Sequence, residues 1–207
     1  MNALKLAVMI LVHPKDAFPL IKMDRDRFSY IPALVLLVML MATRVACIYI
    51  VHYPLALLQP RDTNFLLEVV KMLVPLLTWV VSCYSITTIS SGECLMREVL
   101  MAAAYAMLPY IVLMIPIALL SRILTGYEAV LYYGLQTFVW VWVVLLFLIS
   151  IHSMNDYTVK ETLGIFFLSI IGIVLIWVLI GLFYSLSKHL LSFIVSIVRE
   201  IQFIFMH

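Results

Sequence analysis

The chain has 207 residues, of which 66% are hydrophobic and 12% are charged, and its mean hydropathy is +1.17. Soluble domains are about 45–50% apolar and about 25% charged. The composition therefore excludes a soluble fold and predicts an all-α bundle of membrane-spanning helices. The formal net charge of +2 is small and the sequence holds no basic stripe or zinc spacing, so we expect no nucleic-acid partner.

The N-terminal segment, residues 1–29, comes before the first long apolar run. Apolar residues recur at helical spacing up to Val12, which predicts a short amphipathic helix at the bilayer surface. This helix should end at His13 and Pro14, because the residue before a proline avoids the helical region. We interpret the charged stretch from Lys15 to Ser29 as a solvated connector.

Five apolar segments then follow, each long enough to cross a hydrocarbon core of about 30 Å. Together they form a predicted membrane domain over residues 30–187, with helices at Tyr30–Tyr53, Phe65–Ile89, Leu95–Leu120, Ala129–Ile151 and Thr162–Leu186. Residues 188–207 alternate polar and apolar groups at helical spacing, which favours a second amphipathic helix at the membrane surface. A sixth span is the alternative for this tail.

The distribution of lysine and arginine predicts the orientation of the chain. Residues 1–29 carry five cationic side chains, and Arg97 and Lys160 fall in loops on the same side of the predicted bundle. Since cytoplasmic loops are enriched in such residues, we expect a cytosolic N-terminus and an external C-terminus.

Three charged residues define a candidate polar site within the membrane. Arg44 lies deep in the first predicted span, and Glu68 and Lys71 begin the second span from the same side. Because ionisable residues at membrane depth are functional candidates, an Arg44–Glu68 pair indicates an anion or lipid-headgroup site. The alternative is an internal salt bridge that holds two helices together.

A second candidate is the polar turn before the third span, which contains Gly92 and Glu93, with Arg97 just beyond it. We interpret this turn as a possible docking point for a partner protein. The alternative is local, since an acidic residue near a helix start complements the helix dipole.

Small residues and prolines predict close packing and kinks in the membrane helices. Ala102 and Ala106 lie on the third span, and Gly164 and Gly172 lie on the fifth, where neighbouring helices could approach closely. Two prolines interrupt the third span and predict kinks there, Pro109 and Pro116.

Several stretches resemble the Yip family, the Ypt/Rab-interacting integral membrane proteins. These are Gly92–Glu93, Ala104–Tyr110, Ile151–Thr162 and His13–Phe18. The resemblance implies five spans and a cytosolic N-terminus. Eukaryotic members are linked to prenylated small GTPases and vesicle traffic and usually have a long cytosolic N-terminal region, whereas the chain here, with about 29 residues before its first span, looks more like a bacterial member. A small GTPase is therefore not an expected partner. The bacterial cytoplasmic membrane is the expected location, with a eukaryotic endomembrane as the alternative.

The sequence favours a membrane scaffold or accessory subunit that contacts its partners laterally through Ala102–Ala106 and the face with Gly164 and Gly172. It lacks HExxH, GxSxG, paired membrane aspartates and a glycine-rich phosphate loop, so we expect no enzyme, no catalytic or metal-ligating residue and no cofactor. The expected partners are bilayer lipid and either another membrane protein or further copies of the chain. The alternative function is a permease-like or lipid-handling protein that uses Arg44 and Glu68.

Overall fold

The computed structural model describes residues 3–23, 30–51, 55, 63–124 and 126–205. Within these residues the fold is all helical, which confirms the predicted class. The helices are α1 (Ala3–Val12), α2 (Pro14–Met23), α3 (Ile31–Ile50), α4 (Phe65–Ile89), α5 (Met96–Ala106), α6 (Leu108–Leu120), the short 3-10 helix η1 (Gly126–Glu128), α7 (Ala129–Asn155) and α8 (Val159–Phe205). Several predicted features lie outside the described residues, namely the connector charges from Asp24 to Arg27 and the end of the first span at Tyr53.

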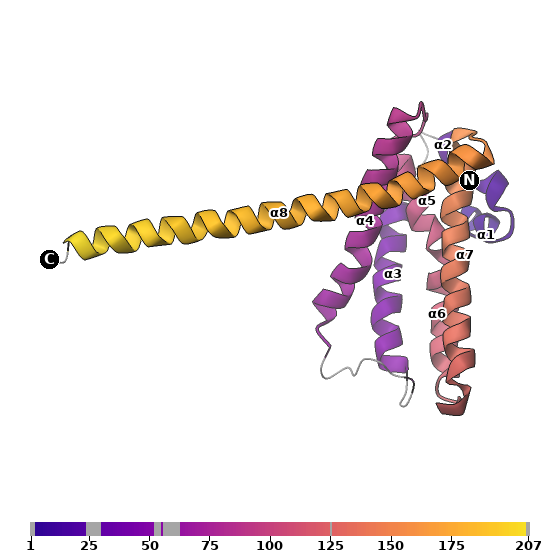
Figure 1. The fold of residues 1–207 in the computed structure, drawn as a ribbon. Helices are drawn as coiled ribbons and strands as arrows, with labels where there is room; N and C mark the ends of the chain where they lie inside the picture. The colour runs from indigo at the N-terminus through magenta and orange to yellow at the C-terminus, as the bar shows by residue number, and fades with distance from the viewer. Residues whose placement is uncertain (1–2, 24–29, 52–54, 56–62, 125, 206–207) are drawn as a thin grey trace.

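Helices α3, α4, α6 and α7 run side by side, and α5 continues the line of α6 into the middle of the bundle (Figure 1). Five helical segments within the described residues are long and apolar enough to cross a membrane. In the most apolar stretch of the third, Met96–Leu120, 67% of the residues are buried, against 33% or less in the other four. The third segment is therefore the centre of the fold.

The third span is divided, whereas we expected one kinked helix over Leu95–Leu120. Helix α5 ends at Ala106, and Met107 breaks the regular pattern by donating its N–H to Ala104 O at 3.3 Å. Pro109 explains this break, because its nitrogen cannot donate to the carbonyl of Tyr105 and its ring crowds that carbonyl. Pro116 lies inside α6, which continues past it to Leu120.

The N-terminal helices belong to the bundle, which corrects the interpretation of residues after Lys15 as a solvated connector. Helix α1 forms where the sequence predicts it, but it buries Leu6 and Ile10 completely. Helix α2 buries Ala17, Phe18 and Ile21, and it packs against α5 and α7. Apolar burial of this extent requires protein neighbours, so α2 is a structural helix of the bundle.

Helix α8 is continuous over 47 residues, so the predicted boundary between residues 187 and 188 is not a break in the helix. It packs on α4 and α7 at its start, runs across the other long helices and then extends well beyond them (Figure 1). At the α4 crossing, the Ser82 hydroxyl donates to Ser169 O at 2.7 Å. A Cβ on Gly172 would collide with Ser82 Oγ, so this glycine permits the close approach that its sequence context predicts.

The alanines of α5 pack inside the molecule. Every residue from 101 to 111 is buried, including Ala102 and Ala106, which are 3% and 0% exposed. Close packing at these positions was expected, but a lateral surface for a partner protein was also expected there. That second expectation is wrong, because helices of the same chain already cover the alanines.

Candidate functional site

The predicted Arg44–Glu68 ion pair is present, and Lys71 joins it. Arg44 donates to Glu68 Oε2 from Nη2 at 2.7 Å and from Nε at 3.2 Å. Lys71 Nζ donates to Glu68 Oε1 at 2.8 Å. The Glu68 side chain is only 4% exposed, whereas those of Arg44 and Lys71 are 33% and 67% exposed. One buried carboxylate therefore binds two cations, and the cluster carries one net positive charge.

Local structure brings these three residues together. Asn64 begins α4, and its side-chain oxygen accepts hydrogen bonds from Leu66 N and Leu67 N. This cap fixes the first turn, which places Glu68 near the positive end of the helix dipole. Arg44 lies about two turns before the end of α3, and the antiparallel packing of α3 on α4 sets it opposite Glu68.

The second candidate, the turn between α4 and α5, is joined to α2 and to the turn between α7 and α8. Lys22 Nζ lies 2.5 Å from Glu93 Oε2 and 3.4 Å from Met154 O. The Cys94 thiol lies 3.5 Å from the same Met154 carbonyl. Hydrogen bonding to Glu93 raises the pKa of Lys22 above its usual 10.5, so Lys22 stays protonated at neutral pH. Three segments distant in sequence therefore meet at this end of the bundle.

Gly92 is required by close backbone packing in that turn. A Cβ there would lie 2.7 Å from Thr87 O, 2.7 Å from Tyr157 OH and 2.9 Å from Asn155 Oδ1. The Tyr157 hydroxyl also lies 3.2 Å from Ser90 O. The turn is thus held from inside by residues of the α7–α8 region, and no side chain larger than hydrogen fits at position 92.

Arg97, just beyond the turn, contacts the start of α3. Its guanidinium carbon lies 5.7 Å from the centre of the Tyr30 ring, a cation–π contact that links α5 to the start of α3. The next residue, Glu98, is fully buried and its Oε2 accepts a hydrogen bond from Leu95 N at 2.9 Å, which caps α5. The residues of the predicted docking turn therefore make two separate contacts within the chain: Glu93 with α2, and Arg97 with the start of α3.

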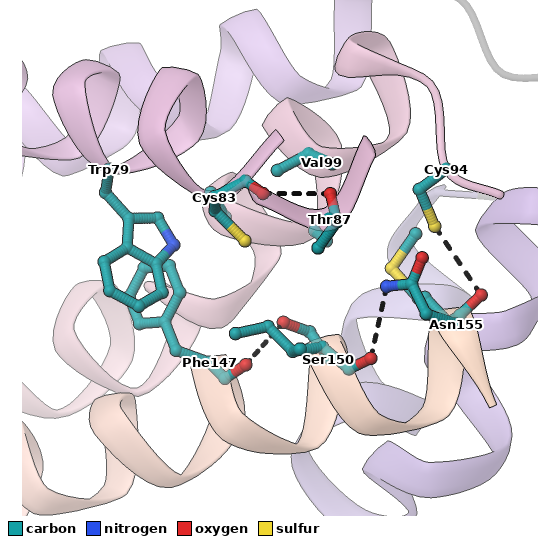
Figure 2. A pocket seen from close by; sticks show the side chains of 12 residues that line it. Trp79, Cys83, Thr87, Cys94, Val99, Phe147, Ser150 and Asn155 are labelled. Carbon is teal, nitrogen blue, oxygen red and sulfur yellow. Dashed lines mark hydrogen bonds between the residues drawn. The ribbon is translucent and has the colours of Figure 1, made fainter. Parts of the chain in front are cut away.

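An internal cavity of about 20 Å³ lies between α4, α5 and α7. Figure 2 shows Cys83 and Thr87 facing Ser150 across it, with Trp79 at one end and Asn155 at the other. The hydroxyls of Thr87 and Ser150 donate to carbonyls of their own helices. A volume of about 10–15 Å³ is needed for one water molecule, so this cavity has room for a water and is too small for a metabolite.

The described residues contain no group of three or more His, Cys, Asp or Glu side chains that could hold a metal ion. The fold defines the class of the protein: an all-α bundle with the architecture of a multi-pass integral membrane protein. No family model, no curated protein and no solved structure matches the chain.

Sequence reasoning missed Lys22 and Tyr157, which connect the turns at one end of the bundle. Lys22 was assigned to a solvated connector because charges surround it. The spacing of Ala17, Phe18 and Ile21 is the signal that could have predicted a helix with Lys22 at its last turn. The partner of Lys22 is 71 residues away in the chain, and no local pattern reports a contact of that range.

Proposed function

We propose that this chain is a non-enzymatic scaffold or accessory subunit of a membrane assembly. The observation that carries the proposal is the projecting part of α8. Every residue from 177 to 197 is exposed, and most are large and apolar, including Leu182 at 62% and Phe183 at 73%. A helix that only completes its own bundle buries one face along its length. This segment instead offers its full circumference to neighbours in the bilayer.

The polar side chains also favour a structural role. Glu68 binds Arg44 and Lys71, Glu93 binds Lys22, and Glu98 caps its own helix. These carboxylates are engaged in contacts that join or end helices, and the cavity of Figure 2 is too small for a substrate. This supports a protein that works by contact.

The test is site-specific photocrosslinking in native membranes. A photoreactive residue at Leu179 on α8 should give a discrete protein adduct, because this position is 64% exposed on the projecting segment. The matched control is Leu34, which is 63% exposed on α3, and it should react with lipid alone. Lipid adducts alone at both positions would contradict the scaffold proposal.

A second candidate function is lipid handling or permeation at the cluster of Arg44, Glu68 and Lys71. Its net positive charge and the exposed ammonium of Lys71 favour an anionic headgroup. Under this proposal Arg44→Leu lowers the binding of phosphatidylglycerol vesicles or the transport of an anion. Unchanged binding and transport in a folded variant would remove the role from Arg44.

The setting of the protein is part of the proposal. The cationic residues of the N-terminal segment support a cytosolic N-terminus. The stretches that resemble the Yip family favour a bacterial-type member in the cytoplasmic membrane, with a eukaryotic endomembrane as the alternative. The expected partners are lipid and another membrane protein or further copies of the chain, and a small GTPase is not among them.

A further inference from the structure

Helix α8 carries one continuous row of small and apolar residues. The row begins where α8 packs on the bundle and continues along the part of the helix that projects from it. The row repeats at alternating intervals of four and three residues, the 3.5-residue period at which one helix keeps a single seam against another. Its members are Gly164, Leu168, Ile171, Leu175, Val178 and Leu182. The five with side chains are between 49% and 62% exposed. Another face of α8, which includes Ser169 and Gly172, is the one that packs on α4.

The base of this row forms an open groove. The groove has a volume of about 500 Å³ and is lined by Gly164, Leu168 and Ile171, with Tyr157 and Glu161 at its polar end. A Cβ on Gly164 would meet nothing within 4 Å. At Gly164, therefore, no side chain fills the groove and the backbone of α8 is accessible. This permits the close approach of a second helix.

We propose that the occupant is α8 of a second copy, packed antiparallel along this row; the inference rests on the scaffold proposal and names its partner. Two copies in one bilayer share the same orientation, so a closed pair requires a two-fold axis along the membrane normal. The long helices α3, α4, α6 and α7 give the direction of that normal, and α8 runs across them (Figure 1). A helix that lies across a two-fold axis is antiparallel to its mate.

The sequence fixes the register of this pair. Placing Leu182 of the partner over Gly164 sets a large residue against a bare backbone. The same register places Val178 of the partner opposite Leu168, and Leu175 of the partner opposite Ile171. Each apolar member of the row then meets an apolar member of the other copy. Because the pairing is reciprocal, both grooves are filled at once and the assembly closes as a dimer.

The polar ends of the two helices also complement one another. Beyond the apolar row, Lys188 and His189 of the partner reach the turn that carries Asp156 and Glu161, with Lys160 beside them. The apolar row and the groove at its base lie on one side of α8, so both copies bury them in the same contact.

The test is disulfide cross-linking between two differently tagged full-length copies in the same membrane. Gly164→Cys in one copy and Leu182→Cys in the other should give a mixed dimer on mild oxidation. The matched control replaces Leu182→Cys by Ile180→Cys, which is also exposed on α8, at 52% against 62%, but lies on the opposite side of the helix from the row. The three native cysteines are buried and give the background with the unsubstituted chain.

A second variant measures the association directly. Gly164→Leu fills the groove, and we expect dimerisation in liposomes to weaken about tenfold, which corresponds to about 1.4 kcal/mol. Unfolding of the bundle should not become easier, because a Cβ on Gly164 would meet no atom within 4 Å. Gly134→Leu is the control, since its Cβ position on α7 is equally open.

The outcomes separate this inference from the scaffold proposal. A mixed 164–182 dimer together with the weaker association of Gly164→Leu supports it. Cross-linking of α8 to a different protein, or a monomer by photobleaching in native membranes, overturns it. In the first of these cases the scaffold proposal still holds, whereas exclusive lipid adducts from the projecting segment contradict both.

Discussion

Single residues at one end of the bundle carry much of its connectivity, and Gly92 is the clearest example. Its position is set by the carbonyl of Thr87, which belongs to the backbone and cannot rotate away. The sequence identifies Gly92 as a turn residue. It does not predict that Tyr157 and Asn155, more than 60 residues later in the chain, pack against it. A glycine noted for partner docking is thus explained by packing within the chain.

We predict that Gly92→Ala destabilises the protein by about 1–3 kcal/mol, because the new methyl group overlaps a fixed carbonyl and two side-chain oxygens. Thermal unfolding in detergent would measure the loss. Gly134→Ala is the matched control and should be neutral or stabilising by up to about 1 kcal/mol, since its Cβ is unopposed within α7. Equal stabilities for the two variants would contradict this account of Gly92.

The cluster of Arg44, Glu68 and Lys71 makes a graded prediction. Glu68→Gln removes the buried charge shared by both cations and should cost about 2–4 kcal/mol. Lys71→Gln should cost less than about 1 kcal/mol, because this side chain is 67% exposed and an exposed ion pair contributes little. Denaturant unfolding of both variants gives the comparison. A Lys71 variant that is as unstable as the Glu68 variant would show that the three charges act as one unit.

At the scale of elements, the glycines of α8 have two kinds of surroundings. Gly172 contacts α4 within the chain, whereas a Cβ on Gly164 or Gly181 would meet nothing within 4 Å. In the sequence all three are glycines within one apolar segment, and nothing local distinguishes them. The difference arises because α8 crosses α4 at one place and leaves the bundle beyond it, and a crossing point is a property of the tertiary arrangement.

We expect Gly172→Ala to cost about 1–2 kcal/mol, because its methyl group displaces the Ser82 hydroxyl from its hydrogen bond to Ser169 O. Adding Ser82→Ala should bring little further loss, since the displaced hydroxyl is already gone. Thermal unfolding of the single and double variants tests this coupling. Gly181→Ala is the control and, like Gly134→Ala, should be neutral or stabilising by up to about 1 kcal/mol. Additive losses in the double variant would argue against direct contact.

Other elements show why parts of the fold could be predicted and others could not. The positions of four long spans and the Arg44–Glu68 pair follow from hydropathy and from the antiparallel order of consecutive helices. Division of the third span at Met107 does not, because Pro109 allows either a kink or a break and packing decides between them. Continuity of α8 was missed for a related reason. Ser187 and Lys188 lower the hydropathy of the sequence without interrupting the backbone hydrogen bonds of the helix.

At the scale of the whole molecule, the bundle is organised around a helix that its neighbours cover from several sides. Helix α5 packs against α1, α2, α3, α4 and α7. Glu98 near its start is fully buried, and we expect loss of α7, one of the helices that cover α5, to expose this carboxylate. Exposing a carboxylate to lipid costs free energy. We therefore expect α5 to be stable in the membrane only when the whole bundle has formed.

This arrangement predicts how protease resistance develops along the chain. Chains that end at Glu128, before α7, should be degraded rapidly in the membrane, whereas chains that extend through α7 should resist. Pulse-chase measurement of half-lives provides the test, and Glu98→Gln should lengthen the half-life of the shorter chain because its uncharged side chain is less costly in lipid. Equal half-lives for the two lengths would show that α7 is not needed to shield α5.

The central position of α5 also has a consequence for biosynthesis. The ribosome delivers α5 before the helices that enclose it on the α7 side, so for a time the cell holds an inserted but unfinished protein. During that interval, quality-control proteases or a holding chaperone have access to the part of α5 that α7 covers in the mature bundle. The order of synthesis therefore makes completion of α7 the step at which the chain passes from a degradable intermediate to a durable membrane component.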